Sequence, residues 1–384
     1  MGPKQKKTVL LVVITAIFAD MLTYGLIVPF LPIHAKSLGA TQSEIGLLFA
    51  SYSIALFIGT PIFGALADRV GRKKLLVSGL SILTATTIVY SLSTSFWMLI
   101  IARSLQGLAA AIPWTAGLAL LAEAFPVTEQ GKAMGIALSG QAAGILLGPP
   151  MGGWLFEAGG YSCPFFTAGA IALLSTFLCA MLLQKITEKK AKSVISPFKI
   201  LRHRQILIIS GSAVIGAATF ASIEPTLPIH LNADLNLSPG IIGSMFVIMT
   251  LAYGTTSPII GAVSIRLGPI KTIMIGIVMA AIMLPLNALT LTVWSQVIFL
   301  ALLGISLGMI LTPSLPKLAE ISRNLGGMSQ GLTFAVYNTA YSLGMMLGPL
   351  IAGSLAEGYG LIVAYAAIGA AFLFYLYPLY KMTK

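Results

Sequence analysis

The sequence predicts an all-α integral membrane protein with twelve transmembrane helices in two pseudo-symmetric six-helix halves. Three observations predict this fold class. Hydrophobic residues make up 57% of the 384 residues, and charged residues only 9%. Apolar segments long enough to cross a bilayer, about 20 residues each, recur along the whole chain. The second half also repeats motifs of the first. A soluble core of this size could not bury so much apolar surface.

Each expected span is an apolar run bounded by polar, basic or glycine-proline connections. In chain order, the spans are expected at about 8–34, 42–66, 74–93, 96–123, 130–157, 162–184, 205–231, 239–263, 270–290, 294–318, 327–356 and 361–380. The basic stretch 185–204 joins the halves. The predicted domains are therefore an N-terminal half, 1–184, a cytoplasmic linker, 185–204, and a C-terminal half, 205–384.

Lysine and arginine gather on alternate connections between the spans. They precede the first span, follow the second, fourth, sixth and eighth, and end the chain, whereas the opposite connections carry Lys36 as their only base. Because basic residues mark the cytoplasmic side, both termini are expected to be cytoplasmic. The net charge of +12 is thus a sign of topology, and no nucleic-acid partner is expected.

An internal repeat relates the two halves. The segment VPFLPIH at 28–34 corresponds to EPTLPIH at 224–230, at an offset of 196. Further on, Gly144, Gly148 and Pro149 recur at an offset of 200. Residues present in both copies are expected to serve the shared fold. Residues present in one copy are better candidates for chemistry.

Two carboxylates lie inside predicted spans, Asp20 in 8–34 and Glu224 in 205–231. A charge at membrane depth costs at least ~3 kcal/mol, so such residues are retained mainly where they face a cavity, an ion path or a substrate. The repeat places Gly216 opposite Asp20 and Val28 opposite Glu224, so both acids are candidates for chemistry, with a structural hydrogen bond as the alternative for Asp20 and an interfacial acid as the alternative for Glu224. The chain is therefore expected to move a solute.

Three motifs resemble those of the major facilitator superfamily. The segment GALADRVGRKK at 64–74 resembles its signature loop, RSLQG at 103–107 its Arg-x-x-Gln-Gly motif, and GILLGPPMGG at 144–153 the glycine-proline motif of its antiporters. Glycines allow close approach and tight turns. The resemblance implies the major facilitator fold and gating by these residues, with plain helix packing as the alternative for the last motif. The expected gating residues are Gly64, Asp68, Arg69, Gly71, Arg72, Gly144, Gly148 and Pro149.

Within this superfamily the drug/proton antiporter branch fits best, and the chain resembles bacterial relatives of the vesicular monoamine transporters. Asp20 resembles their amine-binding Asp, and EPTLPI at 224–229 resembles their Glu-Pro-x-Leu-Pro-Ile segment, whose Glu serves substrate and proton. Met21 and Asn338 depart from their pattern. The resemblance implies a proton-coupled antiporter that exports lipophilic organic cations, such as monoamines and cationic drugs, by alternating access. Efflux of neutral compounds such as sugars or antibiotics, or proton symport, is the alternative.

Arg103 is expected to neutralise one of the two acids and to take part in proton coupling with both of them. At 1.5 Å per residue it lies about 10 Å from the outer end of its helix, which favours Glu224 over Asp20. Aromatic side chains could surround a cation, because their π-faces attract it, although packing is the alternative for each. The expected lining residues, besides Asp20 and Glu224, are Tyr24, Trp114, Phe220, Phe334, Tyr337, Asn338 and Tyr341.

Other classes of protein fit the sequence poorly. It contains no His-x-x-x-His, Gly-x-Ser-x-Gly or Gly-x-x-x-x-Gly-Lys-Ser/Thr motif, so hydrolysis and ATP-driven pumping are not expected. A non-transporting receptor would not need charges within its spans. We therefore expect no enzyme activity, no metal and no cofactor other than the coupling proton. The expected partners are a small organic cation, the proton and the lipid bilayer, for a monomer in the cell membrane of a bacterium.

Overall fold

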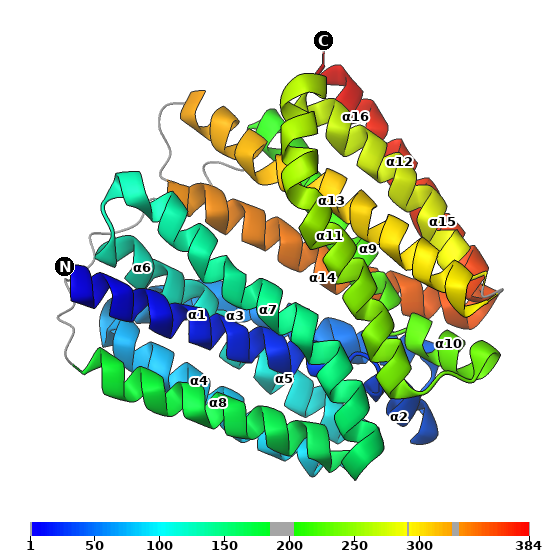
Figure 1. Cartoon of the computed structure of the whole chain (residues 1–384), viewed down its shortest axis with the longest axis horizontal. Helices are drawn as coiled ribbons and strands as arrows, with labels where there is room; N and C mark the ends of the chain where they lie inside the picture. Colours follow the sequence, from blue (N-terminus) through cyan, green and yellow to red (C-terminus); the bar gives the residue numbers. More distant parts are fainter. Residues whose placement is uncertain (1, 185–202, 290–291, 325–329, 384) are drawn as a thin grey trace. The chain divides into compact units, whose positions relative to one another are not determined.

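A computed structural model describes residues 2–184, 203–289, 292–324 and 330–383. It divides into two compact units (Figure 1). Unit 1 comprises Met1–Leu31 and Ser51–Val194, and unit 2 comprises Pro32–Ala50 and Ile195–Lys384. Apart from His203 and Arg204, the predicted linker lies outside the described residues. The all-helical membrane fold that the sequence predicts is confirmed.

Eleven helical segments of the described chain are long and apolar enough to cross a membrane, against twelve predicted. The remaining predicted span, 130–157, is helix α7, Val127–Gly159, with 33 residues. Its length suits a span, but glycine, proline and Gln141 lower its hydropathy. Its identity as a span therefore rests on its length and packing rather than on apolar composition.

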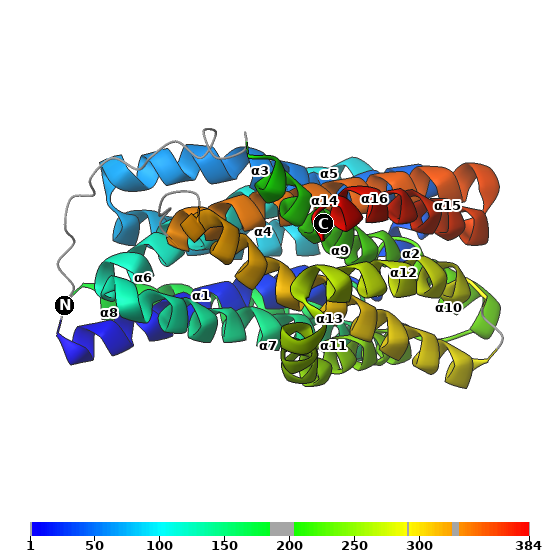
Figure 2. The ribbon, with the colours of Figure 1, turned by 90° about the horizontal axis from the view of Figure 1, so that it is seen from above.

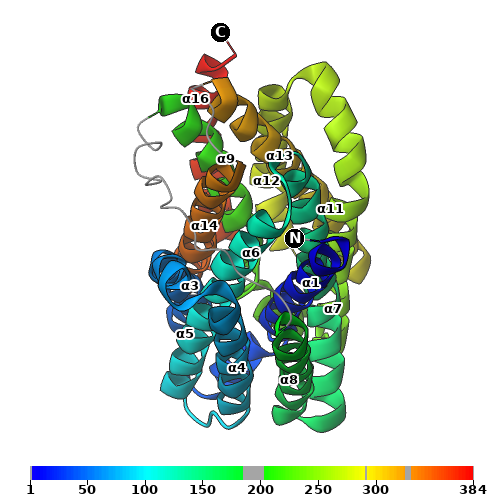
Figure 3. The same ribbon diagram turned by 90° about the vertical axis from the view of Figure 1, so that its left-hand side faces the viewer.

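Unit 1 is built around α1, which packs against α7 and α8, while α4 packs against α5 and α8. Figure 3 shows these helices nearly end on. Helix α3 begins in unit 2 and continues into unit 1. The elements from the N-terminus onward are α1 (Pro3–Leu26), α2 (Leu31–Ser37), α3 (Gln42–Val70), α4 (Arg72–Ser91), α5 (Phe96–Ile112), the π-helix η1 (Pro113–Gly117), α6 (Leu118–Ala124), α7 and α8 (Ser162–Leu183).

Unit 2 contains the other long helices. Helix α13 packs against α11 and α12, and α14 packs against α9, as Figures 1 and 2 show. The elements are α9 (Arg204–Ile223), α10 (Leu227–Leu235), α11 (Pro239–Leu267), α12 (Pro269–Asn287), α13 (Val293–Asn324), α14 (Gln330–Tyr359), α15 (Leu361–Phe374) and α16 (Leu376–Lys381).

The sequence repeat is visible as a repeated break in helix. The predicted span 8–34 is α1, a turn and α2, and the predicted span 205–231 is α9, a turn and the first part of α10. Pro29 and Pro225 lie in the two breaks, and Pro32 and Pro228 are the second residues of the helices that follow, α2 and α10. Proline lacks the N–H of the helical hydrogen bond and clashes with the preceding turn, so each helix ends early.

Glycines bring helix backbones into direct contact in both halves. A Cβ atom added to Gly144 of α7 would lie 2.7 Å from the backbone nitrogen of Leu22 in α1, and one added to Gly148 would lie 3.0 Å from the carbonyl oxygen of Leu22. In unit 2, a Cβ atom on Gly348 of α14 would lie 2.6 Å from the carbonyl oxygen of Ala218 in α9. The helix packing given above as the alternative role of these glycines is thus present in the structure, and gating by Gly144 and Gly148 stays a prediction.

Candidate functional site

Asp20 lies at the centre of a buried polar cluster in unit 1. Its side chain is fully buried in α1. The indole Nε1 of Trp114 donates a hydrogen bond to Oδ2 of Asp20 at 3.0 Å. The hydroxyl of Tyr52, from α3, lies 3.3 Å from Oδ1 and 3.4 Å from Oδ2. Two aromatic side chains from different helices therefore hold this carboxylate.

Arg103, from α5, is a fully buried side chain of the same unit. Its guanidinium carbon lies 4.6 Å from the ring centre of Tyr24 and 4.7 Å from that of Tyr52. These two rings are 4.8 Å apart. Nη1 of Arg103 donates a hydrogen bond to Oε1 of Gln106 at 2.8 Å. The cation–π contacts and this hydrogen bond replace part of the hydration that the guanidinium loses on burial.

Tyr52 joins the acid to the base. Its hydroxyl faces Asp20 while its ring faces Arg103. A hydroxyl that donates to a carboxylate makes its ring more electron-rich, which strengthens the attraction for the guanidinium. Arg103 is also close enough to act electrostatically on Asp20. The structure thus groups Arg103 with Asp20, whereas the helical rise favoured Glu224.

The position of Trp114 depends on a local widening of the helix. Residues Pro113–Gly117 form a π-helical turn between α5 and α6. Pro113 cannot donate the backbone hydrogen bond of a regular turn, which favours a change in helical register there. Single π-helical turns inside α-helices are frequent at functional sites. Here the turn carries the indole that donates to Asp20.

Glu224 is fully buried in unit 2, at the break between α9 and α10. The side-chain amide of Gln42, from α3, donates to the carbonyl oxygen of Pro225 at 3.0 Å. The hydroxyl of Thr226 donates to the carbonyl oxygen of Ser222 at 2.8 Å and lies 2.6 Å from the hydroxyl of Tyr365. Glu224 therefore belongs to a turn that is fixed from both sides.

Tyrosines of α11 and α14 lie near Glu224. The rings of Tyr337 and Tyr341 stack with centres 6.5 Å apart. Both interact electrostatically with Tyr253, and Tyr341 also interacts with Glu224. Unit 2 thus holds a second group of an acid and aromatic hydroxyls.

The remaining predicted lining residues are less clearly placed. Phe220 of α9 and Asn338 of α14 are half-buried. Phe334 lies in α14, but its side chain is outside the described part. The structure therefore brings Asp20, Tyr24, Trp114 and Arg103 together in unit 1. It groups Glu224 with Tyr341 and Tyr337 in unit 2.

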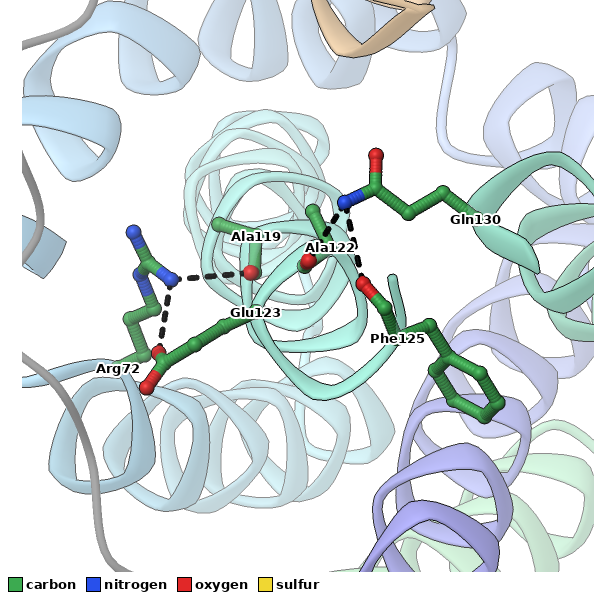
Figure 4. Close-up of polar contacts among 6 residues, drawn as sticks. All are labelled: Arg72, Ala119, Ala122, Glu123, Phe125 and Gln130. Atoms are coloured by element: carbon green, nitrogen blue, oxygen red, sulfur yellow. Dashed lines mark hydrogen bonds and ion pairs between the residues drawn. The ribbon is translucent and has the colours of Figure 1, made fainter. Parts of the chain in front are cut away.

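Arg72, the first residue of α4, forms an ion pair whose partner, Glu123 of α6, the sequence did not predict. The guanidinium of Arg72 lies 2.9 Å from the carboxylate of Glu123, and both side chains are largely buried, with 14% and 11% exposed. Arg72 also donates to the carbonyl oxygen of Ala119 at 3.0 Å (Figure 4). The amide of Gln130 bonds the carbonyl oxygens of Ala122 and Phe125 on the other side of α6, at 2.7 Å and 3.2 Å.

The predictions for the other residues of the motif at 64–74 have separate outcomes. Gly71 has a φ of +99°, which side chains rarely adopt, so it makes the turn between α3 and α4 as expected. Arg69 is exposed, and the side chain of Asp68 lies outside the described part. Within unit 1, no heavy atom of the described residues lies within 4 Å of a Cβ atom placed on Gly64, so the close approach expected there stays a prediction.

Sequence reasoning missed Tyr52 and Tyr253. Each lies in an apolar helix, where an aromatic residue produces no periodic signal. The internal repeat held the signal, because the offset of 197 between α3 and α11 places Met249 opposite Tyr52 and Leu56 opposite Tyr253. Each tyrosine is therefore present in one copy, as Asp20 and Glu224 are.

Comparisons with known proteins agree with this architecture. The model of the Major Facilitator Superfamily matches residues 13–229 and 209–383. A crystal structure of a bacterial homologue of the human lysosomal transporter Spinster, inward-facing and unoccupied, superposes with a TM-score of 0.77 at 16% identity, covering 99% of this chain and 96% of that one. At this identity the likeness shows the fold alone.

Curated relatives resemble the chain over most of its length. The synaptic vesicular amine transporter of Mus musculus is 28% identical over 334 residues, which cover 86% of this chain but only 65% of that protein. The MFS-type transporter SLC18B1 of Rattus norvegicus is 27% identical over 384 residues, covering 93% of this chain and 84% of that protein. The chain thus spans about two thirds of the length of the first relative.

Proposed function

Because the chain belongs to the Major Facilitator Superfamily, and is therefore a membrane transporter and not an enzyme, we propose that it is a proton-coupled antiporter. It exports lipophilic organic cations by alternating access. Monoamines and cationic drugs are the substrate class. The proton is the coupling ion, and the protein acts as a monomer.

The buried carboxylate of Asp20 carries this proposal. A carboxylate removed from water is stable when it is paired with a cation or protonated. An organic cation and a proton can therefore compete for Asp20, and this competition is exchange. The neighbouring ring of Trp114 offers a π-face suited to an ammonium group, whereas the rings of Tyr24 and Tyr52 already face Arg103. The distant relationship to vesicular amine transporters supports the same class.

Glu224 has the role of main proton carrier in this proposal. It is fully buried, and the aromatic hydroxyl of Tyr341 lies within electrostatic range. Phe220, Phe334, Tyr337 and Asn338 complete the substrate surface contributed by the C-terminal half. Arg103 tunes the charge of Asp20 through Tyr52.

Gating is proposed for two sets of residues. The loop residues Gly64, Asp68, Arg69, Gly71 and Arg72 latch the cytoplasmic side, with Glu123 as the partner of Arg72. The segment with Gly144, Gly148 and Pro149 serves as the axis along which α1 and α7 stay joined. The protein resides in the cell membrane of a bacterium with both termini cytoplasmic, as the distribution of Lys and Arg favours.

Transport by Asp20→Asn in proteoliposomes tests the function. We expect uptake of a fluorescent organic cation under an imposed pH gradient to be lost in this variant. The matched control, Glu157→Gln, removes an exposed acid of the same unit and should transport normally. Unchanged cation uptake by Asp20→Asn would reject the assignment. Uptake of a neutral sugar in place of the cation would instead favour the alternative substrate class.

A further inference from the structure

An open cavity lies beside the turn that carries Glu224. Its empty volume is about 550 Å³, part of it open solvent. It is lined by residues of α2, α3, α10, α14 and α15 and of the turn before α10, among them Lys36, Gln42, Thr226, Ile229, His230 and Leu361. Helices α2 and α10 lie at the same end of Figure 1. All of these residues belong to unit 2.

One peptide unit separates this cavity from the buried acid. Thr226 is 3% exposed yet lines the cavity, while Glu224, two positions earlier, is fully buried. Between them lies Pro225, whose carbonyl oxygen accepts the hydrogen bond from Gln42. The turn that carries Glu224 therefore contributes Thr226 to the wall of the cavity.

Gln42 is itself held in place by its neighbours. The backbone nitrogen of Ser43 donates to a carboxylate oxygen of Glu357 at 2.7 Å. A Cβ atom on Gly46 would meet the carbonyl oxygen of Pro349, so this part of α3 lies directly against α14. The first turns of α3 thus hold the Gln42 amide over the Pro225 carbonyl.

Polar and charged groups surround the cavity on several elements. Among the lining residues, the polar or charged ones are Lys36 of α2, Gln42 of α3, Thr226 and His230. His230 of α10 lies 2.8 Å from the carbonyl oxygen of Ala288 and 3.2 Å from a carboxylate oxygen of Asp234. Tyr365 of α15 reaches the hydroxyl of Thr226. Half of the lining residues are apolar, and Lys36, Gln42, Thr226 and His230 offer water hydrogen-bonding partners among them.

We propose that this cavity is the solvent route to Glu224 and that Gln42 is the positioning residue that closes it. The hydrogen bond from Gln42 keeps the Glu224–Thr226 turn folded against the acid. When that bond breaks, water from the cavity reaches Glu224. This inference rests on the proposed function only in making Glu224 the proton carrier, because access to the acid can be measured without transport.

Carboxyl labelling tests the proposal on the full-length protein in liposomes. A water-soluble carbodiimide with an amine nucleophile modifies carboxyl groups that water reaches, and mass spectrometry gives the extent at each acid. Gln42→Met keeps the length of the side chain but removes the donor. Loss of one neutral hydrogen bond should raise the labelling rate of Glu224 about fivefold. Lys36→Met, which lines the same cavity and leaves the Gln42 bond intact, should match the unmodified protein.

Two further measurements distinguish loss of closure at Glu224 from a general loosening of the whole protein. Labelling of Asp20, in the other unit, should stay unchanged in Gln42→Met. Gln42→Glu, which is isosteric but has no amide donor, should raise Glu224 labelling in the same way. The proposal is overturned if Glu224 labelling is unchanged in both Gln42 variants, or if Asp20 labelling rises equally. A failure of the proposed function, seen as normal transport by Glu224→Gln, would leave the labelling result standing.

Discussion

The hydroxyl of Tyr52, in α3, lies 3.3 Å from the carboxylate of Asp20, in α1, while the face of the same ring contacts the Arg103 guanidinium. Tyr52 thus couples the charge state of Asp20 to its own attraction for Arg103. A proton or a cation arriving at Asp20 weakens this hydrogen bond. The ring then attracts the guanidinium less strongly, so the charge state of Asp20 bears on how firmly α3 and α5 are held to α1.

Tyr52→Phe keeps the ring and removes the hydroxyl. Because a hydrogen bond to the ionised form of Asp20 is lost, a proton should compete better with the cation. The loss is about 1 kcal/mol, so cation binding at neutral pH should weaken about fivefold. Isothermal titration of purified protein measures it. Tyr359→Phe, at a tyrosine that is 71% exposed, serves as the control. Equal affinity in both variants would contradict the role of the hydroxyl.

Glu224→Gln mimics a permanently protonated carboxyl. If Glu224 carries the proton, this variant should lose transport driven by a pH gradient and still bind the cation, with an affinity that depends less on pH. Proton release on addition of cation to purified protein, followed with a pH dye, should fall. Glu320→Gln changes a partly exposed acid of the same unit and should release protons normally. Unchanged release from Glu224→Gln would make Asp20 the carrier.

The pair of Arg72 and Glu123 should contribute to stability, because both side chains are largely buried. We expect Arg72→Glu and Glu123→Arg to destabilise unit 1 individually and the double swap to recover part of the loss. A double-mutant cycle of unfolding in mixed micelles should give a coupling of about 1–3 kcal/mol. Recovery should be partial, because the bond from Arg72 to Ala119 is not restored. Additive effects of the two single changes would show that the pair is not coupled.

Alanine substitutions along α7 should separate packed from free glycines. Gly144→Ala places a Cβ atom 2.7 Å from a backbone nitrogen of α1 and should cost about 1–3 kcal/mol by overpacking. Gly135→Ala meets no atom within 4 Å among the described residues and should stabilise the helix by about 0.5–1 kcal/mol. Melting temperatures in detergent should therefore move in opposite directions. A shift of the same sign in both variants would argue against the close α1–α7 contact.

Hydropathy predicted the helices well because lipid exposure requires long apolar runs whatever the partner. The predicted span 239–263, for example, is α11, Pro239–Leu267. Breaks in the helical geometry inside a span were harder to predict from the sequence. The apolar run 96–123 continues without interruption through the π-helical turn Pro113–Gly117, so hydropathy gives no sign of it.

The sequence predicted the two acids of the site, Asp20 and Glu224, but only some of the residues that contact them. An acid inside a span is visible from sequence alone, because its free-energy cost does not depend on its neighbours. The partner of Arg72 was not visible. Glu123 lies 51 positions away, and the contact depends on the rotation of α4 against α6. Arg103 was predicted to need a buried partner. The helical rise alone could not locate its rings, which come from α1 and α3.

The glycine contacts between α1 and α7 limit how this transporter can diversify. Cβ atoms on Gly140 and Gly144 would meet the backbone of α1, as would those on Gly148 and Gly152. Because these glycines bring α7 against backbone atoms of α1, a single methyl group added at one of them would push against the helix that carries Asp20. The aromatic residues on the other sides of the acid are free of that constraint. New substrate preferences are therefore expected to arise by exchange of rings around a fixed carboxylate, and a library that varies Tyr24, Tyr52 and Trp114 should yield folded variants far more often than one that varies the glycines.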